Sequence, residues 1–312
     1  PPAVFGAYNL DEKVRNASSS GGVFTAFAKE ILKGGYVVGA AFTGTKKVEH
    51  VIVENEEGLA ALRGSKYLQS DVNGVYEKTA ELLKRGKKVL FSGTPCEIGG
   101  LKAYLGKDYE NLITVDFICH GVSSPELFAE HIGYLEKKAS SKAERVVFRE
   151  KREDAKNLNL TVGFGNGEKY FSDAEKDDYY LSFVTDFNLR KSCYTCSFKQ
   201  KKRISDITIA DFWGVDKEYG IKDEKKGYSL VMPHTEKGKA LFSAVSGNLF
   251  VFPAEYSKAL RHNPSYVSSA KEPILAEQFM KVAQKSGLKR AVKKYCGNTF
   301  RAKLKRLKSK LI

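Results

Sequence analysis

The sequence lacks long hydrophobic runs: no stretch approaches the roughly eighteen consecutive apolar residues of a membrane-spanning helix. It also has no internal repeat and no low-complexity tract. With 312 residues and 42% hydrophobic content, the chain can still bury a sizeable core. We therefore expect a globular protein of one large domain or two.

Cysteine is scarce, and an amino-terminal leader is missing. The first residue is Pro1 and no apolar leader follows, so we expect a processed or truncated piece of a longer protein. The chain has five cysteines, an odd number. Without a secretory signal this favours the reducing cytoplasm, where closely spaced cysteines more often bind metal than form a disulfide.

One cysteine pair has the spacing of a metal site. Cys193 and Cys196 are separated by two residues, which lets a tight turn point both sulfurs at one soft metal centre. A zinc ion or an iron–sulfur cluster needs about four ligands, so two more must come from elsewhere. Cys96 and Cys119 each follow an apolar run that predicts a buried strand. Considered alone, Cys96 or Cys119 would be interpreted as a buried structural cysteine. Because both follow consecutive predicted strands at equivalent positions, the pair favours metal ligation.

The fold class follows from the order of the predicted elements. Strand, glycine turn and helix follow one another in 88–105 and again in 112–135, which is typical of a doubly wound sheet. Alternating residues around Gly165-Asn166-Gly167 indicate a hairpin, so an antiparallel insertion begins after about residue 143. We expect an α/β fold (α+β overall), with a mixed sheet and helices on its faces. Further strands are predicted at 36–42, 49–54, 206–211 and 229–233, and a strand or linker at 4–10.

The net charge of +15 is concentrated in the tail. After Met280, lysines and arginines alternate with apolar residues from Leu288 to Leu311 at helical spacing, which predicts a basic amphipathic helix. It packs on its own domain or a partner, or contacts an anionic membrane surface; no specific nucleic acid is expected. We place the division at 1–255 for the main domain and 256–312 for the helical basic tail.

Two polar clusters are candidates for binding an anion. Ser19, Ser20, Gly21 and Gly22 precede a predicted helix, where free amides bind phosphate, although a plain N-cap explains them equally well. The run is neither a Walker motif nor a GxGxxG fingerprint. Arg63-Gly64-Ser65-Lys66-Tyr67 combines cations, a hydroxyl and a glycine, with a solvated turn as the alternative.

Six segments carry a family pattern when they are taken together and in order. They are Ser19–Gly22, Arg63–Tyr67 with Gln69 and Ser70, Ser92–Cys96, Asp116–Gly121, Arg190–Cys196 and Ser205–Gly214. With these motifs, which cover about residues 16–235, the sequence resembles the coenzyme F420 hydrogenase/dehydrogenase beta-subunit family of iron–sulfur flavoproteins. The tail after about Tyr256 is not part of the resemblance.

The resemblance implies FAD, a 4Fe-4S cluster and electron transfer to a redox coenzyme or a ferredoxin-like carrier protein. The implied cluster ligands are Cys96, Cys119, Cys193 and Cys196. The implied flavin-binding residues are Ser19, Ser20, Gly21, Gly22, Ser65, Lys66, Tyr67, Thr94 and His120. Lys66 would stabilise the anionic reduced flavin. Cys296 matches no motif and is expected to stay a thiol outside the cluster.

Further expectations concern the surroundings of the cysteines. Asp116 and His120 flank Cys119 and could form hydrogen bonds around it, although His120 could equally be a satisfied polar residue at a strand end. Phe212 and Trp213 could shield a cluster from water, but core packing is favoured for both. No catalytic residue is assigned.

The family name does not fix the substrate. Many relatives begin with a ferredoxin-like segment that this chain lacks, and many bacterial members occur where the deazaflavin coenzyme is not known to be made. Some of those lie beside surface-polysaccharide genes, so a link to polysaccharide synthesis is an expectation. A cytoplasmic location is expected, with peripheral contact at the inner face of the membrane as a further option.

Two other function classes compete with the redox interpretation. Four cysteines also fit a zinc ion that stabilises a non-catalytic module, with the basic tail binding a partner, lipid or nucleic acid. Alternatively, Cys96 is a nucleophile and His120 its base, which requires contact between the two side chains.

Overall fold

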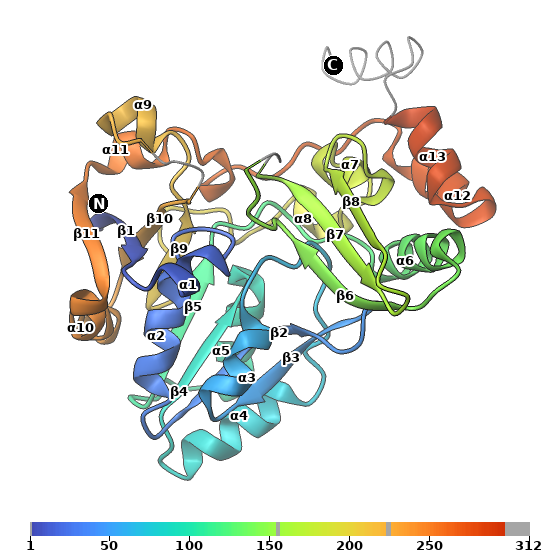
Figure 1. Ribbon diagram of the computed structural model, residues 1–312. Helices are drawn as coiled ribbons and strands as arrows, with labels where there is room; N and C mark the ends of the chain where they lie inside the picture. Colours follow the sequence, from blue (N-terminus) through green and yellow to red (C-terminus); the bar gives the residue numbers. More distant parts are fainter. Residues whose placement is uncertain (1, 154–156, 223–225, 297–312) are drawn as a thin grey trace.

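The protein is organised around an eight-stranded mixed sheet (Figure 1). The computed structural model describes residues 2–153, 157–222 and 226–296. In sheet order the strands are β11 (Leu249–Ala254), β1 (Val4–Asn9), β10 (Ser229–Pro233), β9 (Ile207–Asp211), β5 (Leu112–Phe117), β4 (Val89–Gly93), β2 (Tyr36–Phe42) and β3 (Val48–Val53). Strands β2, β4, β5 and β9 are parallel neighbours, and the outer pairs are antiparallel. The predicted mixed sheet is confirmed.

Helices cover both faces of this sheet, as predicted. Helices α2 (Val23–Ile31), α3 (Glu56–Leu62) and α10 (Glu236–Val245) pack on one face, and α4 (Val75–Lys84) and α5 (Pro95–Leu105) on the other. In α2 the buried Val23, Phe27 and Ile31 recur every four residues, so one side of the helix is apolar. Burial of such apolar sides against the parallel strands holds the layers together.

A separate antiparallel sheet follows the parallel strands. It consists of β6 (Ala143–Phe148), β7 (Asn159–Phe164) and β8 (Lys169–Asp173). Gly167, in the turn between β7 and β8, has φ +85°, a conformation that glycine adopts without strain. The antiparallel insertion predicted after about residue 143 is therefore confirmed.

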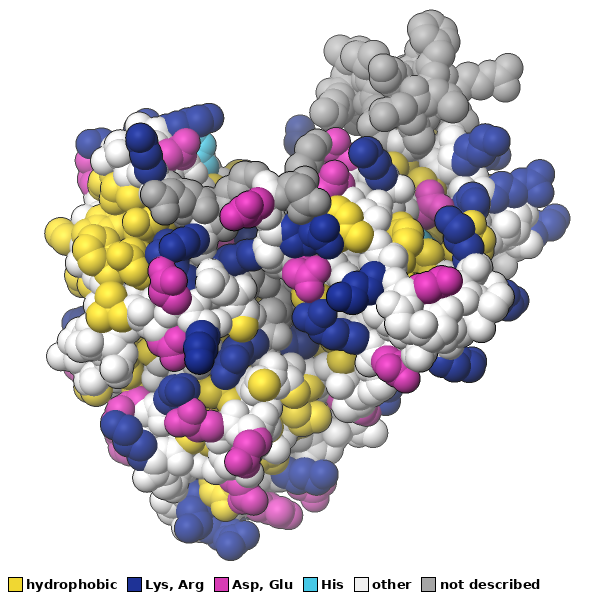
Figure 2. Space-filling view, in the orientation of Figure 1, with side chains coloured by type: hydrophobic (Ala, Val, Ile, Leu, Met, Phe, Trp, Pro, Cys, Tyr) yellow, Lys and Arg dark blue, Asp and Glu magenta, His cyan; other side chains and the backbone are white. Residues whose placement is uncertain are grey.

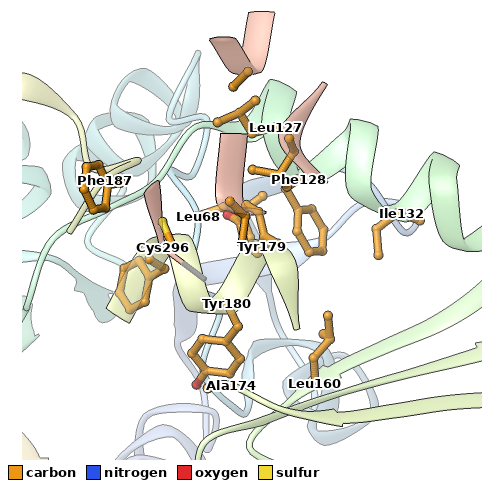
Figure 3. Packing of buried hydrophobic residues seen from close by; sticks show 14 of the residues in the cluster. Leu68, Leu127, Phe128, Ile132, Leu160, Ala174, Tyr179, Tyr180, Phe187 and Cys296 are labelled. Atoms are coloured by element: carbon orange, nitrogen blue, oxygen red, sulfur yellow. The ribbon is translucent and has the colours of Figure 1, made fainter. Parts of the chain in front are cut away.

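A second core fills the space between the small sheet and four helices. These are α6 (Pro125–Ala139), α7 (Asp178–Val184), α12 (Ala276–Ser286) and α13 (Leu288–Tyr295). Figure 3 shows Phe128, Tyr179 and Tyr180 in this cluster, together with Cys296 at the end of α13. All four are completely or almost completely buried, so this lobe has its own hydrophobic core.

The basic tail forms two helices in the described chain, in place of the single predicted helix after Met280. Gly287 separates α12 from α13 with φ +86°, a backbone conformation outside the α-helical region. Phe279, Ala283, Leu288 and other apolar residues of both helices are buried in the second core. The lysines and arginines are exposed, and Figure 2 shows them gathered over α12 and α13. The prediction that the apolar side of the tail packs on its own chain is confirmed. The rest of the predicted helix, residues 297–312, lies outside the described residues. The domain division at residue 255 stays a prediction.

Several short elements are not predicted by the sequence pattern. They are α1 (Glu12–Asn16), α8 (Lys191–Tyr194), α9 (Val215–Tyr219), α11 (Tyr256–Leu260) and the edge strand β11. Strand β11 carries Pro253, which sequence patterns associate with turns but which an edge strand tolerates. None of the helices found in the described ranges has the length and apolar character needed to span a bilayer.

Candidate functional site

Cys96 lies in the first turn of α5, directly after β4. Thr94 caps this helix: its hydroxyl accepts the Glu97 amide at 3.3 Å, and the Glu97 carboxylate accepts the Thr94 amide at 2.7 Å. Thr94 Oγ1 also lies 3.1 Å from Cys96 Sγ. This reciprocal cap, with Pro95 at the helix start, turns the strand sharply into the helix and fixes the thiol at the carboxyl end of β4.

Cys119 occupies the equivalent place after β5. Strands β4 and β5 are parallel neighbours in register from Val89 opposite Leu112. The two cysteines therefore follow adjacent strands at one edge of the sheet, as the repeated strand–turn–helix pattern predicts.

Cys193 and Cys196 lie in and just after α8, which contacts the segment that follows β5. The Arg190 amide donates to the Val122 carbonyl at 2.9 Å. A Cβ atom added to Gly121 would lie 3.4 Å from the Cys193 Cβ, which is van der Waals distance. The cysteine pair is thus held directly beside the Cys119 segment.

The surroundings of three of the thiols disfavour their charged form. Burial raises the pKa of Cys96, Cys119 and Cys193, and neighbouring thiols raise each of them further. A soft metal would overcome this by binding the thiolate form. Across 2–153, 157–222 and 226–296, no three His, Cys, Asp or Glu side chains converge as metal ligands do. The donor set fits a soft metal centre in number and chemistry, and ligation by these four residues stays a prediction.

Three hydrogen bonds that no motif predicts hold the cysteine loop, defined as residues 193–203. Lys199 Nζ donates to the carbonyl of Cys119 and, at 2.9 Å, to the carbonyl of Ser265. The Cys196 amide donates to Ser269 Oγ at 3.1 Å. The basic run at 199–203 is the available signal for Lys199, but no local pattern marks the two serines.

Asp116 contacts the same loop through Arg203. Arg203 Nη1 lies 3.6 Å from Asp116 Oδ2, and Nη2 donates to the Tyr266 carbonyl at 3.1 Å. Burial raises the pKa of Asp116 to about 6, although Arg203 acts in the opposite direction. This buried pair joins the base of the cysteine loop to β5.

His120 is engaged away from Cys96. Its Nε2 lies 2.6 Å from Asp186 Oδ1, and its Nδ1 lies 3.4 Å from Ser265 Oγ. No hydrogen bond joins it to Cys96 in the described chain, so the contact required by the nucleophile–base alternative is absent there. A role for His120 in binding a cofactor stays a prediction.

The serine–glycine loop, residues 18–22, lies tightly against β1 and β10. The Gly21 amide donates to Ser229 Oγ at 3.0 Å, and a Cβ on Gly21 would come within 2.5 Å of the Ala7 carbonyl oxygen. Gly22 begins α2 with φ +80° and without a side-chain cap. Gly22 is the N-cap residue of α2, as the plain N-cap interpretation has it, but no serine side chain caps the amides at the start of this helix.

Lys151 fixes this loop from the small-sheet side of the molecule. Its ammonium donates to the carbonyls of Arg15 and Ser20, both at 2.7 Å, and of Lys226 at 2.5 Å. An ammonium group has three hydrogens, so it can donate to all three carbonyls at once. The loop carbonyl of Ser20 is thereby turned toward Lys151, a residue that sequence reasoning misses.

Residues 63–70 link the serine–glycine loop to the cysteine segments. The Ser65 amide donates to Ser19 Oγ at 2.8 Å. The Tyr67 carbonyl accepts the Ser123 hydroxyl at 2.6 Å, and Ser123 lies just beyond Cys119 in the chain. The segment is half-buried between the two groups, and within 63–67 only Gly64 is exposed, as the solvated-turn interpretation requires.

Lys66 and Tyr67 make mainly internal contacts. Lys66 Nζ lies 2.9–3.3 Å from four carbonyl oxygens at the end of α3, those of Ala61, Leu62, Arg63 and Gly64. Removal from water lowers the pKa of Lys66 to about 7. The Tyr67 ring packs against Tyr180 and Phe183 at centroid distances of 5.1 and 4.9 Å. Contact of either side chain with a flavin stays a prediction.

The two aromatic residues after β9 differ in burial. Phe212 is 4% exposed, so its predicted core position is confirmed. Trp213 is 37% exposed, so the core interpretation is wrong for it. The Arg149 guanidinium carbon lies 5.4 Å from the centre of the Trp213 ring and holds one side of it.

Two family models match the chain, and both describe the beta subunit of coenzyme F420 hydrogenase/dehydrogenase. The model of the amino-terminal part of this subunit matches residues 4–77. The model of its carboxyl-terminal part matches residues 86–253. Together they include the serine–glycine loop, residues 63–70 and all four predicted cysteine ligands.

This chain is similar to a curated relative and to solved structures. The coenzyme F420-dependent sulfite reductase of Methanocaldococcus jannaschii is 28% identical over 237 residues, which are 72% of this chain and 34% of that protein. The chain thus spans about a third of the length of this relative. A chain of the F420-reducing [NiFe] hydrogenase complex from Methanosarcina barkeri has a TM-score of 0.54 at 17% identity, covering 91% of this chain and 90% of that one. This second likeness shows a shared fold.

Proposed function

Since the chain belongs to the coenzyme F420 hydrogenase/dehydrogenase beta-subunit family, we propose that it is an oxidoreductase that uses FAD and a 4Fe-4S cluster. It would pass electrons between these groups and a hydride-donating coenzyme, F420 or another donor. The observation that supports the proposal is that the three chain segments carrying the four cysteines are neighbours beyond β4 and β5, with residues 63–70 linking them to the serine–glycine loop.

The cluster would be held by the four grouped thiols. Cys96 and Cys119 are supplied by rigid strand ends, whereas Cys193 and Cys196 are supplied by the cysteine loop. That loop is tied to β5 by Lys199 and Arg203 and to residues 265–269 by further hydrogen bonds. These contacts would keep the cysteine loop beside β5 while the thiols close around a cluster.

The flavin would be held around the serine–glycine loop. Ser19, Ser20, Gly21 and Gly22 would face its phosphates, and Ser65, Lys66, Tyr67, Thr94 and His120 would lie toward its ring. When bound, FAD supplies the conversion between two-electron hydride chemistry and the single electrons that a cluster accepts. The chain's own task is to position the groups: Lys151 would fix the loop by binding the Ser20 carbonyl, and the Ser65 amide would hold the Ser19 hydroxyl.

The electron partner would be a redox coenzyme or a ferredoxin-like carrier protein. The exposed lysines and arginines of α12 and α13 would attract an acidic carrier or anionic lipid at low salt. A link to surface-polysaccharide synthesis is part of the same proposal and depends on which donor and acceptor are found.

An anaerobic ultraviolet–visible spectrum tests the proposal, with iron, zinc and flavin quantified on the same sample. We expect flavin bands, a broad iron–sulfur shoulder and about four irons per chain. A colourless protein with one zinc ion would replace the proposal with the zinc-stabilised module. If flavin is present without iron, the cluster assignment is wrong and the flavin assignment survives.

A further inference from the structure

Lys199 is the cation most closely tied to the cysteine group. It follows Cys196 by three residues, and its amide donates to the Cys196 carbonyl at 3.3 Å. Its ammonium reaches the carbonyl of Cys119, 80 residues earlier in the chain. The lysine therefore lies between the backbones of two predicted cluster ligands from different segments.

The Lys199 ammonium contacts neutral carbonyls rather than a carboxylate of the described residues. The second of these contacts is with the carbonyl of Ser265, at 2.9 Å. The groups that act electrostatically on Lys199 are the thiols of Cys119, Cys193 and Cys196, together with Arg203. Burial lowers the pKa of Lys199 and the thiols act in the opposite direction, while the contact with the Cys119 carbonyl fixes the ammonium beside the backbone of a predicted ligand.

A half-buried charge in this position affects the energy of nearby negative charge. A 4Fe-4S cluster with four thiolates is anionic, and each reduction makes it more negative by one charge. A fixed cation in a partly desolvated site lowers the cost of that added charge more than an exposed cation does, because water screens the latter.

We propose that Lys199 is a charge-compensating residue of the four-cysteine centre, which raises the reduction potential of a cluster bound there. The inference rests on the proposed function, since it assumes a cluster on these cysteines. Reduction adds one electron to the cluster, supplied by the flavin in the protein or by dithionite in a test. Lys199 undergoes no covalent change and transfers no proton in this role.

A purely structural role makes a different prediction. If Lys199 only joins the cysteine loop to Cys119 and Ser265, its replacement reduces iron retention or stability and leaves the potential of any retained cluster unchanged. The potential, measured by electron paramagnetic resonance during a dithionite titration, therefore separates the two roles.

The experiment compares the purified full chain with Lys199→Met, Lys199→Arg and the control Lys202→Met. Lys202 is exposed in the same loop, so its replacement removes the same charge where water screens it. For Lys199→Met we expect unchanged iron content and a reduction equilibrium about tenfold less favourable, which equals a shift of about −59 mV for one electron. Lys199→Arg should restore the wild-type potential, and Lys202→Met should keep it.

Each outcome decides between the hypotheses. A wild-type potential in Lys199→Met with full iron overturns the inference, and so does an equal shift in Lys202→Met. If Lys199→Met loses iron, Lys199→Gln is measured in its place, because glutamine keeps hydrogen-bond donors without the charge. A wild-type potential in Lys199→Gln with full iron then overturns the inference. Absence of iron from the wild-type chain overturns the proposed function itself, which is a distinguishable result.

Discussion

Arg149 donates two hydrogen bonds to the carboxylate of Asp211, at 2.6 and 2.9 Å, and so joins the end of β6 to the end of β9. The two side chains are 7% and 20% exposed, respectively. Arg149 has φ +59°, a left-handed conformation that costs a non-glycine residue about 1–2 kcal/mol. Because its guanidinium also lies beside Trp213, one ion pair connects the small sheet, the large sheet and the half-exposed tryptophan.

Removing this pair should loosen the junction between the sheets. Arg149→Met leaves the Asp211 carboxylate poorly compensated, so we expect a loss of about 2–4 kcal/mol in the free energy of unfolding, measured in urea. Trp213 is the only tryptophan, so its native fluorescence should shift as its ring becomes more hydrated. The control is Arg145→Met on the same strand, whose pair with Glu150 is 62% exposed on the arginine side. Arg145→Met should lower the free energy of unfolding by less than about 1 kcal/mol. Equal losses in both variants would contradict a special role for the pair of Arg149 and Asp211.

The second prediction concerns acid stability and the buried pair of His131 and Asp177. The two side chains lie 2.7 Å apart, and the Tyr170 hydroxyl also donates to Asp177 at 2.9 Å. Burial alone would raise the pKa of Asp177, but these hydrogen bonds and the His131 charge outweigh it and hold the pKa below the ordinary value. The unfolded chain therefore takes up this proton first as the pH falls.

The sign of the pH effect follows from that lowered pKa. The stabilisation by Asp177 is fully present above its ordinary pKa of about 4 and is lost as the pH falls through the lower folded value. Asp177→Asn should therefore lower the free energy of unfolding at pH 7, and its deficit relative to wild type should shrink below about pH 4. Denaturation at several pH values tests this, with the 90% exposed Asp108 as the site of a control, Asp108→Asn. A deficit that stays constant down to acid pH would rule out the linkage.

A third prediction concerns Lys151 and the serine–glycine loop. Lys151→Met removes three hydrogen bonds that hold the carbonyls of Arg15, Ser20 and Lys226. If the loop binds the flavin phosphates, FAD affinity should fall roughly tenfold, or about 1.4 kcal/mol. Fluorescence titration of the flavin-free protein measures it, and Lys169→Met on the exposed part of β8 is the matched control. Unchanged affinity in Lys151→Met, in a wild type that binds FAD, would show that the loop is not the phosphate site.

The parts of the fold that could be predicted are those with local causes. The strand, turn and helix around Cys96 are encoded by an apolar run, Gly93 and the Thr94 cap with Pro95, all within a few residues. The same pattern before Cys119 gives the neighbouring strand. The local sequence alone therefore predicts that Cys96 and Cys119 lie at the ends of neighbouring strands.

The parts that could not be predicted depend on distant partners. Lys151 contacts Ser20 across 131 residues, and Lys199 contacts Cys119 across 80. No spacing rule relates a lysine to a particular carbonyl so far away. A core position is predicted for Trp213 because large apolar side chains are usually buried, but here Arg149 supports a half-exposed ring.

The last prediction separates the four predicted cluster ligands from the fifth cysteine. Cys96→Ser removes a thiol of the four-cysteine group, so iron content should fall to a small fraction of the wild-type value, as measured by iron analysis and the visible spectrum. Cys296→Ser is the control: Cys296 is 0% exposed in the second core and matches none of the family motifs. A hydroxyl there should cost about 1–3 kcal/mol of stability while the iron per folded chain stays unchanged. Full iron in Cys96→Ser, or iron loss in a folded Cys296→Ser, would show that the ligand set is assigned wrongly, because the two variants exchange the same atom in two different environments.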